Sequence, residues 1–198
     1  MKKAKFFTFF ILPFSFLIFL SSCTRKETPP PVEPVPIPPI HNFALQNLLS
    51  EFPAEIQTTN YSGQVQLIVF FRVDNPACRG SIPDWNALQA DFSPRGFTLV
   101  GAITDQRAPD QVAPDALALG ATFPLGLATP PVLTAFGGPS ALRAIPTAFL
   151  LSRDGSLLRT YSGFEPLPRL REDIHHALDG QDLIDRNPKT TAPEDNDP

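Results

Sequence analysis

Short apolar runs alternate with helix-like stretches through the middle of the chain. The run at residues 64–73 ends in a nearly continuous series of β-branched and aromatic residues, which predicts a buried strand. Apolar residues then recur at three- and four-residue spacing as far as Phe92, which predicts a helix with one apolar face. Asn75 and Pro76 supply the N-cap and the first helical position. The pattern therefore places the start of a helix shortly after a buried strand.

The same alternation continues toward the C-terminus. Asp154 and Gly155 lie between two apolar runs, which is a typical signal for a tight hairpin turn. Strands that alternate with helices indicate an α/β fold, here with a mixed central sheet flanked by helices. The further elements we expect are strands at 97–103 and 123–127, helices at 110–119 and 131–136, a hairpin of 147–152 with 156–161, and a helix at 167–178.

The first residues have the pattern of a signal peptide. A basic start at residues 1–5 precedes a mostly apolar run at residues 6–20, which is short for a membrane span. The sequence Leu-Ser-Ser-Cys that ends at Cys23 resembles the bacterial lipoprotein signal, which predicts cleavage before Cys23 and acyl chains on it. An ordinary cleaved signal or an uncleaved anchor is the alternative. A lipidated Cys23 would hold the protein on a membrane of the bacterial cell envelope, facing the extracytoplasmic (periplasmic) space.

Length and composition divide the chain into segments. Its 198 residues are enough for one ordinary domain with extensions. Many of the 24 prolines precede the expected domain, where they predict a polyproline II spacer. We expect a lipoprotein signal peptide at 1–22, a lipidated N-terminus and proline-rich linker at 23–40, a folded domain at 41–180 and a disordered acidic tail at 181–198.

The net charge and the small numbers of cysteine and histidine residues argue against several classes of function. The formal net charge of −4 argues against a nucleic-acid partner, whose binding surface needs a basic excess. Two cysteines allow neither a disulfide framework nor a four-cysteine zinc site. His175 and His176 are adjacent on an expected helix and face different directions, and no glycine-rich phosphate loop occurs. We expect no metal and no cofactor.

Two segments resemble a known family. Residues 70–88, FFRVDNPACRGSIPDWNAL, resemble the active-site segment of the TlpA/ResA-like thioredoxin family, where a strand precedes Trp-Cys-x-x-Cys, a basic residue and a helix. Residues 144–150, AIPTAFL, and the Arg-Asp-Gly that follows them resemble the cis-proline loop and hairpin of that family. The resemblance implies a thioredoxin-like fold. It also implies that the bond between Ile145 and Pro146 is cis and that Pro146 faces the active-site helix.

The match departs from the family at the attacking cysteine. Asn75 stands where the resemblance places the first cysteine, and Asp74 where it places the tryptophan. Cys78 and Arg79 match the second cysteine and the basic residue. In dithiol exchange, a low-pKa thiolate attacks a disulfide and a second thiol resolves the mixed disulfide. If Cys23 is lipidated, Cys78 is the remaining thiol and the cycle cannot run within one chain.

Two hypotheses follow from this departure, beside the possibility of an unrelated enzyme or a different fold. In the first, a protein of thiol-disulfide oxidoreductase lineage has lost its redox chemistry and binds an extended segment of an extracytoplasmic protein. In the alternative, Cys78 is the catalytic thiol of a monothiol oxidoreductase or peroxidase that needs an external resolving thiol, by analogy with peroxiredoxin-type redoxins. Whether the protein is an enzyme stays open here. The candidate binding residues are Asn75, Pro76, Arg79, Ile145 and Pro146.

Overall fold

The computed structural model describes residues 43–49, 54–181 and 183. The expected signal peptide, Cys23 and the proline-rich linker lie outside the described residues, as does nearly all of the expected tail. The statements below therefore concern the folded domain. In the described part of the chain, no helix has the length and hydropathy needed to cross a bilayer.

A seven-stranded mixed sheet forms the centre of the domain, in the order β2-β1-β5-β4-β3-β6-β7. The neighbours β3, β4 and β5 are parallel, and the other pairs are antiparallel. The strands are β1 (Ala44–Asn47), β2 (Glu55–Gln57), β3 (Val65–Phe71), β4 (Phe97–Ile103), β5 (Leu125–Leu127), β6 (Thr147–Leu151) and β7 (Leu157–Ser162). The helices are α1 (Pro76–Phe92), α2 (Pro109–Ala118), α3 (Pro130–Ala135) and α4 (Leu167–Leu178), with short 3-10 turns at Thr58–Tyr61, Ser93–Arg95 and Pro139–Ala141.

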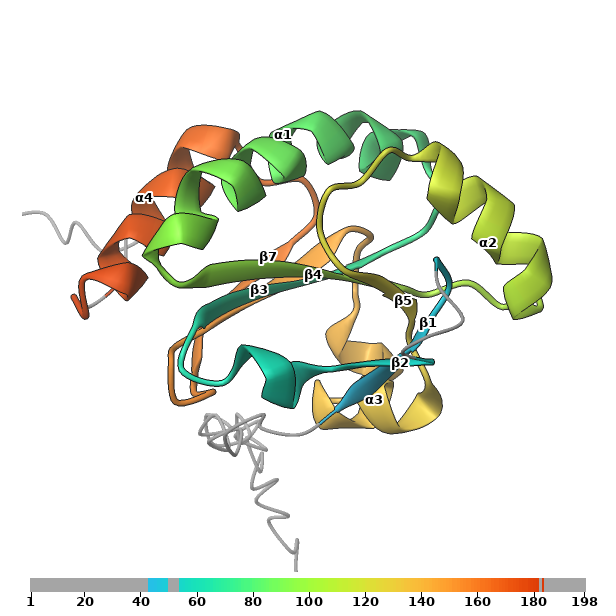
Figure 1. Ribbon diagram of the computed structural model, residues 1–198, viewed down its shortest axis with the longest axis horizontal. Helices are drawn as coiled ribbons and strands as arrows, with labels where there is room; N and C mark the ends of the chain where they lie inside the picture. The colour runs from blue at the N-terminus through green and yellow to red at the C-terminus, as the bar shows by residue number, and fades with distance from the viewer. Residues whose placement is uncertain (1–42, 50–53, 182, 184–198) are drawn as a thin grey trace, which may run out of the picture. The chain divides into compact units, whose positions relative to one another are not determined.

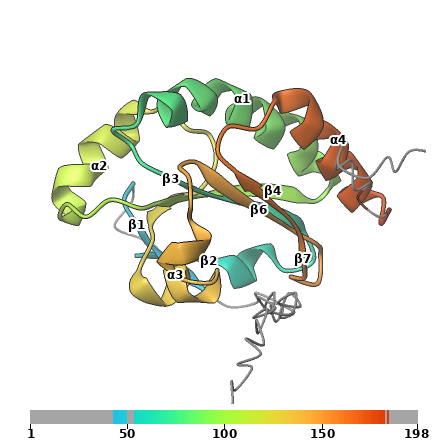
Figure 2. The same cartoon turned by 180° about the vertical axis from the view of Figure 1, so that it is seen from behind.

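Helices cover both faces of this sheet, which explains why its central strands are apolar on both sides. Helices α1, α2 and α4 lie on one face and α3 on the other (Figures 1 and 2). Every residue of β3 and β4 is buried. Along β3, Leu67 and Val69 point to the layer of α1 and α4, whereas Ile68 and Phe70 point to the layer of α3. The continuous apolar runs therefore reflect a sheet enclosed between helices.

The layer on the α3 side is built largely from aromatic rings. The ring of Phe70 on β3 lies edge-on to the rings of Phe136 and Phe149, with centroids 5.0 and 5.7 Å apart. Phe43, at the first described residue, packs in the same way on Phe136 at 5.1 Å. Edge-to-face contacts of this kind stabilise a core beyond the area that they bury. They hold β1 and α3 against the central strands.

The predicted α/β fold with a mixed sheet flanked by helices is confirmed. Each strand and helix expected from residue 64 onward is present, with ends that differ by a few residues at most. The hairpin of β1 and β2 was not predicted. Both strands are three or four residues long and only partly buried, so they show no clear alternation of apolar and polar positions. The pairing of β1 with β5, which is distant in the sequence, places this hairpin at the sheet edge.

One prediction concerns the close approach of β1 to β5. A Cβ atom at Gly126 would lie 2.5 Å from Cβ of Leu45 and 2.8 Å from the carbonyl oxygen of Gln46. Because backbone atoms cannot move aside as a side chain can, we expect Gly126→Ala to lower the free energy of unfolding by about 2–3 kcal/mol in urea titrations. The control is Gly80→Ala within α1, where a Cβ meets nothing within 4 Å. It should stabilise the protein by about 0.5–1 kcal/mol, and equal stabilities of the two variants would contradict the prediction.

Candidate functional site

The junction between β3 and α1 lies at the edge of the sheet where the parallel strands end. β3 ends at Phe71 and β4 at Ile103, and the backbone N–H of Thr104 donates a 2.8 Å hydrogen bond to the carbonyl of Phe71. This bond holds the two strand ends side by side. In α/β folds, the carboxyl edge of parallel strands is the usual place for ligand binding. The segment between Phe71 and the start of α1 is therefore a candidate binding site.

Asn75 caps the start of α1, as the sequence predicts. Its backbone is extended, with φ −82° and ψ 119°, which is the conformation favoured before a proline such as Pro76. Its side-chain Oδ1 accepts hydrogen bonds from the backbone N–H groups of Ala77 at 2.9 Å and Cys78 at 3.2 Å. The amide oxygen thus satisfies two of the N–H groups that every helix start leaves without an intrahelical partner.

Cys78 is a free cysteine whose side chain has no exposed surface. It belongs to the core layer between α1 and the sheet, together with Val73 and Ile82. Burial raises the pKa of the Cys78 thiol, and the nearby carboxylate of Asp74 adds to the rise. A backbone hydrogen bond at Arg72 acts in the opposite direction without reversing the rise in pKa. The thiol is therefore protonated at neutral pH and shielded from solvent.

Ion pairs surround the entrance to α1. Arg72 and Asp74 lie 2.7 Å apart, each about half exposed, and the guanidinium holds the pKa of the Asp74 carboxyl below its usual value. In the loop after β4, Arg107 contacts Asp105 at 2.8 Å and Asp115 at 2.9 Å. Hydrogen bonds from Arg107 lower the pKa of Asp105 in the same way. Asp74 and Asp105 are thus paired with arginines, and their lowered pKa values keep both carboxylates charged near neutral pH.

The Ile145–Pro146 peptide bond is cis, which confirms the prediction from the sequence. The carbonyl of Pro146 accepts a 2.8 Å hydrogen bond from the N–H of Gly163, and the Thr147 hydroxyl donates to the carbonyl of Ala144. Both bonds fix the loop that leads into β6. Neither the N–H nor the C=O of Ile145 has a hydrogen-bond partner within the described part of the chain. The loop therefore presents one unpaired peptide donor and acceptor beside Pro146.

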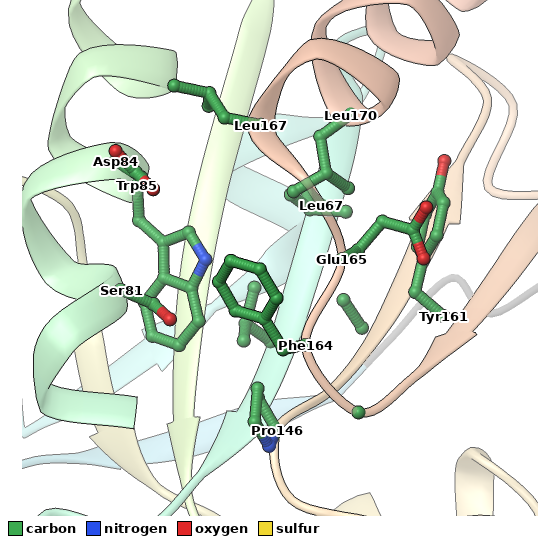
Figure 3. Close-up of a pocket in the computed structure, with 13 residues that line it drawn as sticks. Leu67, Ser81, Asp84, Trp85, Pro146, Tyr161, Phe164, Glu165, Leu167 and Leu170 are labelled. Carbon is green, nitrogen blue, oxygen red and sulfur yellow. The ribbon is translucent and has the colours of Figure 1, made fainter. Parts of the chain in front are cut away.

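A pocket of about 420 Å³, open mouth included, lies beside Pro146 (Figure 3). Trp85 is 5% exposed, and its ring packs edge-on against Phe71 and Phe123 with centroids 5.5 and 6.4 Å apart. Its indole nitrogen faces the pocket and has no hydrogen-bond partner among the residues described. The lining comes from α1, β3, β6 with the loop before it, β7, the loop into α4 and α4 itself: Leu67, Val69, Ser81, Asp84, Trp85, Pro146, Ala148, Tyr161, Gly163, Phe164, Glu165, Leu167 and Leu170.

The pocket brings the cis-proline loop against α1, as expected, but does not unite all candidate site residues. Pro146 shares the pocket with residues of α1, whereas Asn75, Pro76 and Arg79 lie at the start of that helix and outside the lining. Ile145 packs against the same core layer as Cys78. Arg79 is exposed and Cys78 is buried, so the two do not act at one surface.

Sequence reasoning missed most of the pocket. The three- and four-residue spacing places Trp85 on the apolar face of the helix, which agrees with its ring contacts but says nothing of its indole nitrogen. Phe164 and Glu165 follow the hairpin in a loop that carries no motif. The one available signal was a large apolar residue in a turn, and Phe164 is indeed 63% exposed. Across residues 43–49, 54–181 and 183, no group of three or more metal-ligating side chains comes together.

Comparison with solved structures supports the fold. A thiol:disulfide interchange protein of the thioredoxin family from Chlorobium tepidum superposes with a TM-score of 0.62 at 24% identity, over 74% of this chain and 99% of that one. StoA from Bacillus subtilis gives 0.54 at 22% identity, over 69% and 98%. The exposed lipoprotein thioredoxin of Streptococcus pneumoniae gives 0.59 at 15% identity, over 68% and 98%.

Sequence comparison identifies the family to which the chain belongs. A search of curated proteins gives no match. The model of the Redoxin family, however, matches residues 36–176, which is well over half of the chain. That range includes the junction of β3 with α1, the cis-proline loop and the final hairpin. The chain therefore belongs to the Redoxin family and has a thioredoxin-like fold.

Proposed function

We propose that this protein is a membrane-anchored, extracytoplasmic redoxin that has lost dithiol exchange and binds an extended polypeptide segment at the cis-proline loop. The observation that carries the proposal is the structure of the first turn of α1, which has an amide cap and a buried thiol. Asn75 caps the helix at the place where the TlpA/ResA resemblance expects the attacking cysteine, and Cys78 is fully buried behind it.

The chemistry of disulfide exchange explains why this state matters. An attacking thiolate must be exposed, and the helix N-terminus must favour its negative charge. Here the N–H groups at that end are occupied by the neutral amide of Asn75. The thiol of Cys78 has the opposite properties to an attacking thiolate, since its pKa is raised and its surface is covered. The same facts weigh against the alternative of a monothiol oxidoreductase or peroxidase.

The cis-proline loop supplies what a binding function needs. Extended segments add to a protein by pairing their backbone with an unpaired N–H and C=O, and Ile145 offers one of each. Pro146 and the exposed ring of Phe164 lie beside these groups and give apolar surface for side chains of the segment. Asn75, Pro76 and Arg79 at the start of α1 are the further candidate contacts.

The cellular location in this proposal rests on the sequence. The lipoprotein pattern that ends at Cys23 places a lipid anchor there, with the proline-rich residues 23–40 as spacer to the domain at 41–180. The exposed lipoprotein thioredoxin of Streptococcus pneumoniae has the same fold, which agrees with such an arrangement. The partner would then be an extracytoplasmic protein.

The first prediction is that Cys78 does not react in the folded protein. At pH 7 we expect iodoacetamide to modify it at least about a hundredfold more slowly than in 8 M urea, because the thiol is buried and its pKa is raised. Mass spectrometry of digested protein measures the modification. The same preparation should reduce neither insulin nor peroxide in the presence of glutathione. Rapid labelling of Cys78, or turnover that Cys78→Ser abolishes, would favour the monothiol alternative.

The second prediction concerns the backbone of Ile145. Titration with a pool of capped, cysteine-free heptapeptides, alternating valine with random residues, should shift the Ile145 amide signal in NMR spectra. Ile145→Pro removes the donor and should weaken binding at least about fivefold, since one backbone hydrogen bond contributes about 1 kcal/mol. Ile145→Ala keeps the donor and serves as the control. Absence of binding by the unchanged protein would end the binding proposal.

The third prediction tests the anchor. The full chain expressed in a bacterium should partition into the detergent phase of Triton X-114 and incorporate labelled palmitate, because several acyl chains give stable membrane attachment. Cys23→Ala should abolish both properties, whereas Cys78→Ala should leave both unchanged. Palmitate incorporation by the Cys23→Ala variant would show that the anchor is elsewhere.

A further inference from the structure

Asp173 is a carboxylate buried in the layer between α4 and the sheet. Its residue is 5% exposed, and its neighbours on α4, Leu170, Ile174 and Ala177, belong to the apolar core. A carboxylate in such surroundings costs free energy, and replacement of a buried charged pair by apolar residues of similar size is often neutral or stabilising. The stability of the core therefore gives no reason for an acid at this position.

The contacts of the Asp173 carboxylate come from β7. The hydroxyl of Tyr161, a residue that is 3% exposed, donates a 2.7 Å hydrogen bond to Oδ2 of Asp173. Nη1 of Arg159 lies 3.6 Å from the same oxygen. Residues 159 and 161 project to one face of the strand because side chains alternate along it. Burial and the bond to Asp173 raise the pKa of Tyr161, so the phenol stays protonated and remains the donor.

The hydrogen bond between Tyr161 and Asp173 fixes where α4 lies on the sheet. Apolar contacts are non-directional, so several positions of a helix on a sheet bury similar areas. A hydrogen bond between buried groups is satisfied in one arrangement, and a shift of the helix would leave a buried polar group without its partner. The ring of Tyr161 forms part of the wall of the pocket beside Pro146, and its hydroxyl reaches α4 (Figure 3). One side chain thus joins the pocket to the helix.

β7 also connects Tyr161 to the cis-proline loop. Tyr161 pairs with Ala148 on β6, and two residues further along the chain the backbone N–H of Gly163 donates a 2.8 Å hydrogen bond to the carbonyl of Pro146. Gly163 has a φ of +90°, in the left-handed region that favours glycine. The position of Gly163 therefore decides whether the carbonyl of Pro146 keeps its donor.

The connection between β7 and α4 is short. β7 ends at Ser162 and α4 begins at Leu167, so residues 163–166 alone join them. This loop carries Phe164, which is 63% exposed, to the pocket beside Pro146 (Figure 3). Because so short a loop cannot absorb a displacement of the helix, a shift of α4 would move the whole loop relative to Pro146.

We infer that Tyr161 and Asp173 are positioning residues for the proposed binding site: their hydrogen bond holds α4 on β7 and thereby holds residues 163–166 against Pro146. The inference rests on the proposed function and adds two residues that act through this loop. Without the bond, α4 reaches further arrangements on the sheet, and the hydrogen bond from Gly163 to Pro146 opens more often. The surface offered to an extended segment is then less ordered, and binding must supply the cost of ordering it.

Native-state hydrogen exchange of the full chain, followed by NMR, tests this role without a ligand. The protection of the Gly163 amide reports the loop, and that of the Val69 amide in the central strand β3 reports global unfolding. Tyr161→Phe keeps the ring and removes the donor. We expect it to lower the protection of Gly163 at least about tenfold more than that of Val69, since hydrogen bonds to charged groups are among the stronger ones.

Two further variants separate the hydrogen bond from general stability. Asp173→Asn keeps an acceptor oxygen for the Tyr161 hydroxyl, so the losses of protection at Gly163 and Val69 should agree within about threefold. Ile174→Val trims a fully buried neighbour on α4 without touching the pair. It should lower the stability of the whole domain and so lower the protection of Gly163 no more than that of Val69.

A binding measurement then connects the loop to the proposed function. The valine-alternating heptapeptides should bind Tyr161→Phe at least about fivefold more weakly than the unchanged protein, and Ile174→Val within about twofold of it.

Three results would overturn the inference: equal losses of protection at Gly163 and Val69 in Tyr161→Phe, a loss in Asp173→Asn as selective for Gly163 as that in Tyr161→Phe, or equal peptide affinity of Tyr161→Phe and the unchanged protein. The exchange experiment needs no peptide. Failure of the unchanged protein to bind heptapeptides therefore counts against the proposed function alone, and unselective exchange in Tyr161→Phe counts against the positioning role alone.

Discussion

The cap that Asn75 places on α1 is the interaction on which the character of this site depends. A helix start exposes N–H groups that attract negative charge, and in thiol chemistry that attraction is what activates a thiolate. Here a neutral amide oxygen takes two of those N–H groups, at 2.9 and 3.2 Å, so the helix start is satisfied without any ionised side chain. Under the proposed function, the domain would keep the stability that a cap confers without the electrostatic reason for reactivity.

The position of the cis-proline loop does not depend on a reactive thiol. The cis bond before Pro146, the hydrogen bond from Gly163 to the Pro146 carbonyl and the pairing of β6 with β3 hold the loop beside α1. None of these contacts involves Cys78. Because the loop is positioned by the sheet, the loss of an attacking thiol that we propose would leave the unpaired backbone of Ile145 and the pocket in place. A binding function can therefore outlast a catalytic one on the same scaffold.

The sequence was sufficient for the parts of the structure that arise from local pattern. Continuous apolar runs predicted β3 and β4, and Asn75 with Pro76 predicted the first turn of α1. The β1–β2 hairpin escaped prediction because its short strands are defined by pairing with the distant β5. The resemblance predicted the cis bond at Pro146, which no propensity indicates by itself. The pocket arises only when α1 and the loop before α4 pack together, so Phe164 and Glu165 carried no local signal.

Two faces of α1 have different surroundings: one, with Cys78, is buried against the sheet, and the other lies at the pocket. The face of this helix that meets the sheet carries Cys78, Ile82 and Leu88, and it is closed and apolar. One turn beyond Cys78, the neighbouring face of α1 carries Ser81 into the lining of the pocket beside Pro146. Specificity for a partner needs groups that are poorly satisfied until the partner arrives, because such groups penalise the wrong ligand. The buried thiol of Cys78 does not have this property, since burial already suits its neutral form.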